Sequence, residues 1–177
     1  MISLVVLFGM FIALFAVIGA MRGWAKELLV TSAVVLGLFL NAILEAYIAP
    51  YRTALLLQPG GTQFAVRSLL LVLLAFFGYQ TPHIRALQPK VTRERLEELL
   101  LGLVMGLLNG YLLVGSLWYY LHQAGYPTTL IIPPEPGSAL AQQIAATVDY
   151  LPPALLGIPQ VYFAVGVVFV FIIVVFV

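Results

Sequence analysis

The chain has 177 residues, of which 63% are hydrophobic and only 8% are charged, and its mean hydropathy is +1.09. A soluble domain carries about 25% charged residues, so this composition is that of a membrane protein. The net charge of +1 gives no reason to expect a nucleic acid partner, and the absence of cysteine excludes disulfides, thiolate metal sites and cysteine nucleophiles.

The first apolar segment, residues 2–21, is long enough to cross a bilayer. It holds no charge before its end, and about twenty helical residues at 1.5 Å each cover the ~30 Å of hydrocarbon. A signal peptide is the alternative. However, the segment lacks a basic start and is followed by Arg22, Gly23 and Trp24 instead of a small-residue cleavage site. We therefore expect a retained membrane helix.

A polar turn and a second span follow. The turn holds Arg22, Trp24, Lys26 and Glu27, and its indole suits the membrane interface. Residues 28–48 are again apolar and predict a second span in a hairpin with the first. The polar exceptions within this span are Thr31, Asn41 and Glu45.

A third span is predicted at residues 62–79. It comes after a loop or shallow interfacial segment at 55–61, which contains a Pro-Gly-Gly sequence typical of turns. Arg67 lies early in the span, where its long side chain can reach the lipid headgroups. The charged residues of 80–98 then predict the main polar loop, whose last part, with Glu94, Glu97 and Glu98 beside Arg93 and Arg95, is the solvated start of a helix.

Residues 99–121 predict a fourth span with a glycine stripe. Gly102, Gly106 and Gly110 recur every four residues, and small residues at this spacing let a neighbouring helix backbone approach closely in lipid. A narrow pore or a lipid slot is the alternative use of such a stripe, but a packing face needs fewer assumptions. We therefore expect a glycine zipper on the central, protein-contacting helix of the bundle.

The last part of the chain predicts one interfacial helix and one further span. Residues 138–151 begin with a capping Ser138 and have apolar residues every three to four positions, so they predict an amphipathic helix in the interface plane. Residues 160–177 have no charge and predict a fifth span. The expected fold class is thus all-α, a single polytopic membrane domain over 1–177.

Basic residues in the connections predict the orientation in the membrane. The connections after spans one and three hold most of them, whereas those after spans two and four hold only Arg52. Because lysine and arginine accumulate on the cytoplasmic side, we expect the N-terminus outside and the C-terminus in the cytoplasm. The residues on the cytoplasmic side would be Arg22, Lys26, Arg85, Lys90, Arg93 and Arg95.

Two short motifs resemble the colicin V production protein family (CvpA). The first is RGWAKEL at residues 22–28, in which Arg22, Gly23, Lys26 and Glu27 match that family's hairpin. The second is LGLVMGLLNG at residues 101–110, similar to a glycine-rich helix in which the family usually has arginine where Asn109 stands. The family also often has an acidic residue early in the first helix, where residues 2–8 are uncharged here. The similarity covers roughly residues 2–151.

The resemblance implies a bacterial inner-membrane protein linked to export of a peptide toxin and to envelope maintenance, without an established chemistry. A fifth span would be an addition to the usual four. Lipid and other membrane proteins, or further copies of the chain, are the partners that such a protein would have.

Four polar residues inside or beside the spans have alternative uses. Asn109 predicts either a polar site in the bundle or an interhelical hydrogen bond, and we favour the hydrogen bond. Glu45 and Arg67 are expected at similar depth on antiparallel spans; an intramembrane acid can mark a proton route, but we favour an ion pair. His122 could ligate a haem, but a histidine in an aromatic girdle is the simpler interpretation.

No pattern predicts catalysis, a cofactor or a metal site, because nucleophile, phosphate-loop, zinc and nucleotide motifs are all missing. We therefore do not expect an enzyme. Three function classes stay open: a non-enzymatic membrane protein of the colicin V production type, an accessory subunit of a larger, energy-transducing membrane complex, and a small transporter or channel.

Overall fold

The computed structural model describes residues 4–80, 95–127, 131, 134–135 and 137–176, and its regular elements there are all helices. The all-α class is therefore confirmed for this part of the chain. Most of the predicted polar loop, including His83, Arg85, Lys90 and Arg93, lies outside it. The helices are α1 (Leu4–Arg22), α2 (Trp24–Tyr47), α3 (Ala49–Leu56), α4 (Gly60–Gln80), α5 (Arg95–Gln123), α6 (Ala139–Val148), α7 (Pro152–Leu155) and α8 (Gln160–Phe176).

Among the described residues, α1, α2, α4 and α5 are long and apolar enough to cross a membrane. α8 was predicted as a fifth span. It is a 17-residue apolar helix, and 17 residues cover only about 26 Å of the ~30 Å of hydrocarbon. The described helices therefore include four of full spanning length.

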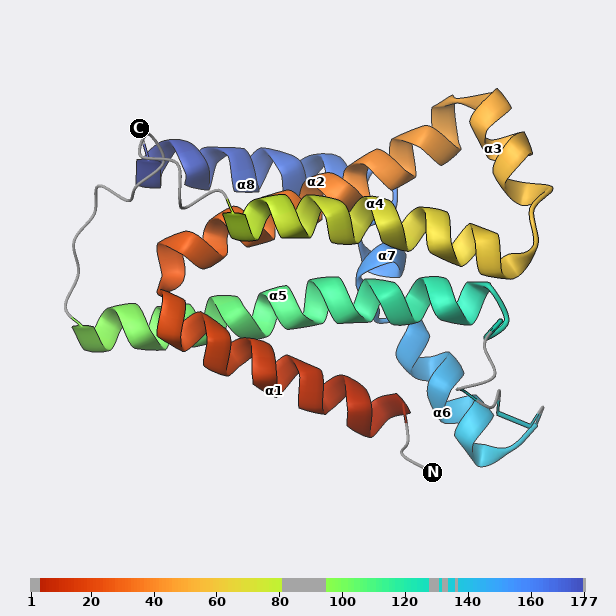
Figure 1. Ribbon diagram of the computed structural model, residues 1–177, viewed down its shortest axis with the longest axis horizontal. Coiled ribbons are helices and arrows are strands. Elements are labelled where there is room, and N and C mark those ends of the chain that lie inside the picture. Colours follow the sequence, from red (N-terminus) through yellow and green to blue (C-terminus); the bar gives the residue numbers. More distant parts are fainter. Residues whose placement is uncertain (1–3, 81–94, 128–130, 132–133, 136, 177) are drawn as a thin grey trace.

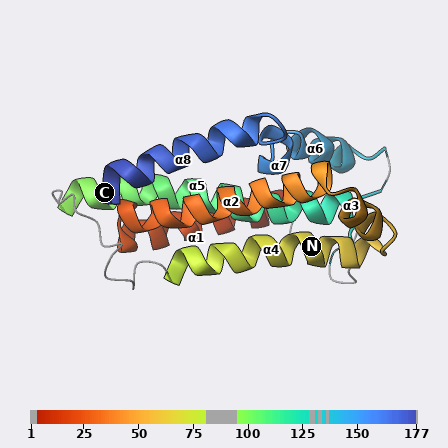
Figure 2. The ribbon, with the colours of Figure 1, turned by 90° about the horizontal axis from the view of Figure 1, so that it is seen from above.

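The long helices lie side by side in a bundle with α2 and α5 at its centre (Figures 1 and 2). α2 contacts α4, α5 and α8, while α5 contacts α1, α2 and α4. Figure 2 shows α8 and α4 on opposite sides of the layer that holds α2 and α5. The bundle core consists of apolar side chains from these inner helices, among them Val30, Val34, Leu38, Leu71 and Leu112.

The connection between α1 and α2 is shorter than predicted. Gly23 alone forms the turn, with φ of +86°, a conformation that glycine adopts without a steric cost. α2 begins at Trp24 instead of residue 28, so Lys26 and Glu27 belong to its first turn. The prediction of a polar turn through Glu27 is therefore wrong, and the physical reason is that partners on α1 and α5 make burial of this carboxylate feasible.

The other boundaries shift by a few residues. The predicted loop at 55–61 is mostly helical, because α3 continues to Leu56 and α4 starts at Gly60. α5 starts at Arg95, so Glu97 and Glu98 lie in its first turn.

The helix predicted at 138–151 is shorter and packs on protein. Ser138 caps α6 by accepting a hydrogen bond from the Ala141 N–H at 3.1 Å. Ile144 and Val148 are buried against Trp118 of α5, whereas Leu140 on the predicted apolar face is exposed. The apolar face of α6 therefore covers part of the bundle through Ile144 and Val148.

The glycine stripe of α5 lies against the backbone of α1. A Cβ atom added to Gly106 would lie 3.0 Å from the Cα of Ala16, and one added to Gly110 would lie 3.0 Å from the Cα of Ile12. A Cβ on Gly102 would meet the carbonyl oxygen of Gly19. Any side chain at these positions would separate the two helices. Gly19, which lies outside the predicted stripe, is thus its partner on α1.

We predict that Gly106→Leu lowers the free energy of unfolding in detergent by about 1–3 kcal/mol or more, because the leucine overfills the closest contact between α1 and α5. Thermal unfolding followed by circular dichroism measures this. Gly9→Leu is the matched control on α1, because nothing lies within 4 Å of an added Cβ there. Equal stability of the two variants would contradict the packing role.

Candidate functional site

Four polar side chains of α2 lie on one face that points into the bundle. Glu27, Thr31, Asn41 and Glu45 fall at helical spacings of three and four residues when Val34 and Leu38 are included in the series. Glu27, Thr31 and Asn41 are all buried. This face therefore carries two polar sites, one near each end of α2.

The first site is the Glu27 cluster, which consists of Arg22, Glu27, Thr31 and Asn109. Arg22 Nη1 donates to Glu27 Oε1 at 2.6 Å, and Asn109 Nδ2 donates to Glu27 Oε2 at 2.8 Å. The Glu27 side chain is 0% exposed. Both carboxylate oxygens thus have a donor, and the buried negative charge has a cationic partner, as such a charge requires.

Asn109 connects α5 to α2 through both polar atoms of its side chain. Its Nδ2 also donates to the backbone oxygen of Glu27 at 3.0 Å, and Thr31 Oγ1 donates to its Oδ1 at 2.7 Å. These contacts are interhelical hydrogen bonds, as predicted for Asn109. A buried amide satisfied in this way fixes the register of the two helices.

Arg22 brings a fourth helix to the cluster. Its Nη2 donates to the backbone oxygen of Tyr79 at 3.2 Å, and its guanidinium lies 4.3 Å from the centre of the Tyr79 ring. Tyr79 is near the end of α4. The last residue of α1 therefore links α2 and α4 at the same point where α5 joins through Asn109.

The two motifs that resemble the colicin V production family meet in this region, although they are far apart in the sequence. Gly23 packs near Gly102, where an added Cβ on Gly102 would lie 3.2 Å from the Gly23 Cα, and Glu27 bonds Asn109. Lys26 differs from them because it is exposed. Arg22, Gly23 and Glu27 of the first motif thus share one contact region with Gly102 and Asn109 of the second.

The second site is the Glu45 pocket near the other end of α2. Arg67 Nε donates to Glu45 Oε1 at 2.7 Å and its Nη2 donates to Oε2 at 2.9 Å, a bidentate ion pair between α4 and α2. The side chain of Arg67 is 7% exposed and that of Glu45 is 29% exposed. Tyr51 on α3 lies nearby; burial, with a further contribution from the Glu45 carboxylate, raises the pKa of its phenol.

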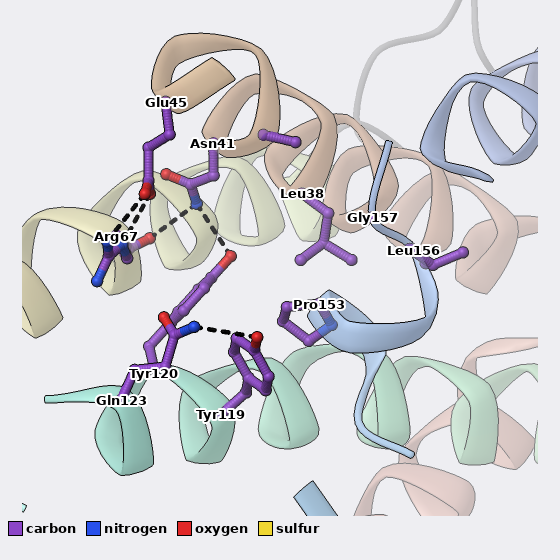
Figure 3. Close-up of a pocket in the computed structure, with 11 residues that line it drawn as sticks. Leu38, Asn41, Glu45, Arg67, Tyr119, Tyr120, Gln123, Pro153, Leu156 and Gly157 are labelled. Atoms are coloured by element: carbon purple, nitrogen blue, oxygen red, sulfur yellow. Dashed lines mark hydrogen bonds and ion pairs between the residues drawn. The ribbon is translucent and has the colours of Figure 1, made fainter. Parts of the chain in front are cut away.

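Asn41 gives the Glu45 pocket an unused acceptor. Its Nδ2 donates to the Arg67 backbone oxygen at 3.2 Å and to the Tyr120 hydroxyl at 3.4 Å, but its Oδ1 has no hydrogen-bond partner among the described residues. Figure 3 shows Asn41 beside the Glu45–Arg67 pair, with Tyr119, Tyr120 and Gln123 of α5 below them. The lining residues are Leu38, Asn41, Ala42, Glu45, Arg67, Tyr119, Tyr120, Gln123, Pro153, Leu156 and Gly157.

This pocket has a volume of about 150 Å³. A cavity needs only about 10–15 Å³ of this kind of volume to hold a water molecule. Since Arg67 and Glu45 neutralise each other, the pocket offers hydrogen bonds but no net charge. It is suited to ordered water, which would satisfy Asn41 Oδ1, and it contains no arrangement of a nucleophile with a base.

The two polar sites are separated by apolar core. Glu45 is eighteen positions after Glu27 along α2, equivalent to about 27 Å of helix. Val30, Val34 and Leu38 are buried in that interval, among side chains of α4 and α5.

The remaining titratable residues of the described chain do not form a metal site. No group of three His, Asp or Glu side chains that could hold an ion occurs within the described ranges. His122 Nδ1 lies 3.0 Å from the Tyr126 hydroxyl just past the end of α5. This imidazole nitrogen thus has a phenol as its hydrogen-bond partner, and the two rings belong to an aromatic cluster.

Comparison of the chain with models of known protein families, with curated proteins and with solved structures found no match. The resemblance to the colicin V production family therefore rests on the two motifs alone, and any functional conclusion depends on the geometry of the sites.

We predict that Asn109→Leu and Thr31→Val destabilise the protein in a non-additive way. Leucine at 109 leaves Glu27 Oε2 without its donor, and valine at 31 leaves Asn109 Oδ1 without one, each at a cost of about 1–3 kcal/mol. In the double variant the Thr31 contribution disappears, since its partner is already gone. A double-mutant cycle from denaturant unfolding in detergent measures the coupling, and strict additivity would contradict the cluster.

We predict that the two substitutions that break the Glu45–Arg67 ion pair destabilise the protein unequally. Glu45→Leu leaves the nearly buried Arg67 guanidinium without a counter-charge, while Arg67→Met leaves a more exposed carboxylate that water can reach. Breaking a buried pair costs about 3–5 kcal/mol, so Glu45→Leu should approach that range and Arg67→Met should cost less. Unfolding temperatures of the two variants test this, and the reverse order would show that the guanidinium reaches solvent by itself.

Proposed function

We propose that this chain is a non-enzymatic integral membrane protein of the colicin V production type. In this proposal it acts in bacterial envelope maintenance or secretion through helix packing and through contacts with lipid and with partner proteins. The single observation that carries the proposal is the meeting of the two motifs, since Arg22, Gly23 and Glu27 of the first contact Gly102 and Asn109 of the second or one another. This meeting supports the proposal because it gives the two motifs a shared structural role.

The direction of the helices supports a consistent topology in the bacterial inner membrane. Val175 and Phe176 of α8 pack against Ala25, Leu28 and Leu29 at the start of α2. The end of α8 is therefore at the same end of the bundle as Lys26. With the basic residues on the cytoplasmic side, the proposed topology has five spans, the N-terminus outside and the C-terminus in the cytoplasm.

The distribution of polar groups supports a structural role over transport. A small transporter would need polar groups that converge at mid-depth. Here the described acids on α2 are each paired with an arginine, and apolar side chains fill the middle of the bundle. The buried charges therefore serve to hold helices together.

We predict that the chain restores secretion of active colicin V in a bacterial strain that lacks its own colicin V production protein. Gly9→Leu should restore it equally, whereas Gly106→Leu should not, because it separates the helices that carry the two motifs. Colicin activity in the medium is the readout, and immunoblotting of the membrane fraction controls for insertion. A wild-type chain that inserts in normal amount yet restores nothing would contradict this function.

A second candidate, an accessory subunit of a larger membrane complex, is favoured by the outer face of α8. Tyr162, Phe163, Val167, Val170 and Phe171 flank Gly166 on one exposed apolar face of α8. Gly166 leaves a notch in this face, because nothing lies within 4 Å of an added Cβ there. A helix of another protein would fit such a notch. Partners that co-purify at fixed stoichiometry after gentle solubilisation, and that Gly166→Leu removes, would favour this alternative.

A further inference from the structure

A basic groove lies between the end of α1 and the start of α5, outside the two polar sites. Its volume is about 500 Å³, several times that of the Glu45 pocket. It is at the same end of the bundle as the Glu27 cluster, with which it shares Arg22. Its lining residues are Val17, Ala20, Met21, Arg22, Gly23, Lys26, Arg95, Glu98, Leu99 and Leu103.

The lining carries three cations and one carboxylate. Arg22 is neutralised by the buried Glu27. Among the described residues, Lys26 and Arg95 have no ion pair, and Glu98 is the only acid that lines the groove. The groove is therefore positively charged and has cationic groups available for an anionic ligand.

The rest of the lining is apolar, which distinguishes this groove from a binding site for a soluble anion. Val17, Ala20 and Met21 come from the last turn and a half of the apolar part of α1, and Leu99 and Leu103 come from the facing turns of α5. The chain thus changes from apolar to basic along the groove wall. A phospholipid has the same order of chemistry, with acyl chains followed by a charged headgroup.

We propose that this groove binds an anionic phospholipid, with the headgroup phosphate at Lys26 and Arg95 and the upper acyl chains against Val17, Met21 and Leu103. The inference rests on the proposed membrane placement, in which this end of the bundle is at the cytoplasmic headgroups. Basic pockets between membrane helices on that side are suited to anionic lipid headgroups. The bound lipid would fill the groove at the junction of α1 and α5.

The test uses the full chain purified in mild detergent and titrated with phosphatidylglycerol or phosphatidylcholine, with bound lipid counted by native mass spectrometry. The wild type should bind phosphatidylglycerol more tightly than phosphatidylcholine. Each cation removed should weaken phosphatidylglycerol binding by about fivefold, so the Lys26→Ala/Arg95→Ala variant should lose about 25-fold. Glu98→Gln should strengthen it. Arg52→Ala on α3 is the matched control, because it removes an exposed cation from the opposite end, and its affinity should equal that of the wild type.

Three results would overturn the proposal. They are equal binding of the two lipids by the wild type, undiminished phosphatidylglycerol binding by the double variant, and displacement of the lipid by millimolar inorganic phosphate, which would identify a soluble-anion site. Circular dichroism of the double variant establishes that it is folded. Because colicin secretion is measured separately, loss of lipid preference and failure to restore secretion are distinguishable outcomes.

Discussion

The burial of the Glu27 carboxylate is the constraint on which the rest of the bundle depends. An isolated carboxylate in an apolar interior is strongly unfavourable, and it is tolerated only when a cation and hydrogen-bond donors surround it. Here the donors come from Arg22 at the end of α1 and Asn109 in α5, and Arg22 is itself held by Tyr79 of α4. Satisfying one side chain of α2 therefore positions three other helices.

The close contact between α1 and α5 belongs to the same arrangement. Arg22 reaches Glu27 from α1, and Asn109 reaches it from α5, so both helices must approach α2 at this end. Gly19 and Gly106 also let α1 and α5 lie against each other, because a Cβ on Gly19 would lie 2.7 Å from the Gly106 Cα. At the other end, Arg67 and Glu45 join α4 to α2. α2 is therefore held near both of its ends, with apolar core between them.

The helical class and the long apolar helices follow from hydropathy alone, because a run of about twenty apolar residues has few other stable structures. The burial of Glu27 does not follow from hydropathy, since charged residues between apolar runs usually mark a connection. A signal was available: Glu27, Thr31, Val34, Leu38, Asn41 and Glu45 form one stripe at three- and four-residue spacing. The identity of the partners was not readable from that stripe, because Asn109 is 82 residues away and only the packed structure brings it near. Likewise, the spacing of α6 gave its apolar face but not the surface, Trp118, that the face covers.

The charge balance of the Glu27 cluster explains how Asn109 is accommodated where the colicin V production family usually has arginine. With Arg22 already paired to Glu27, a second guanidinium would leave the buried cluster with an unpaired positive charge. Asn109 instead supplies the remaining donor to Glu27 without a charge of its own, so the buried cluster stays neutral.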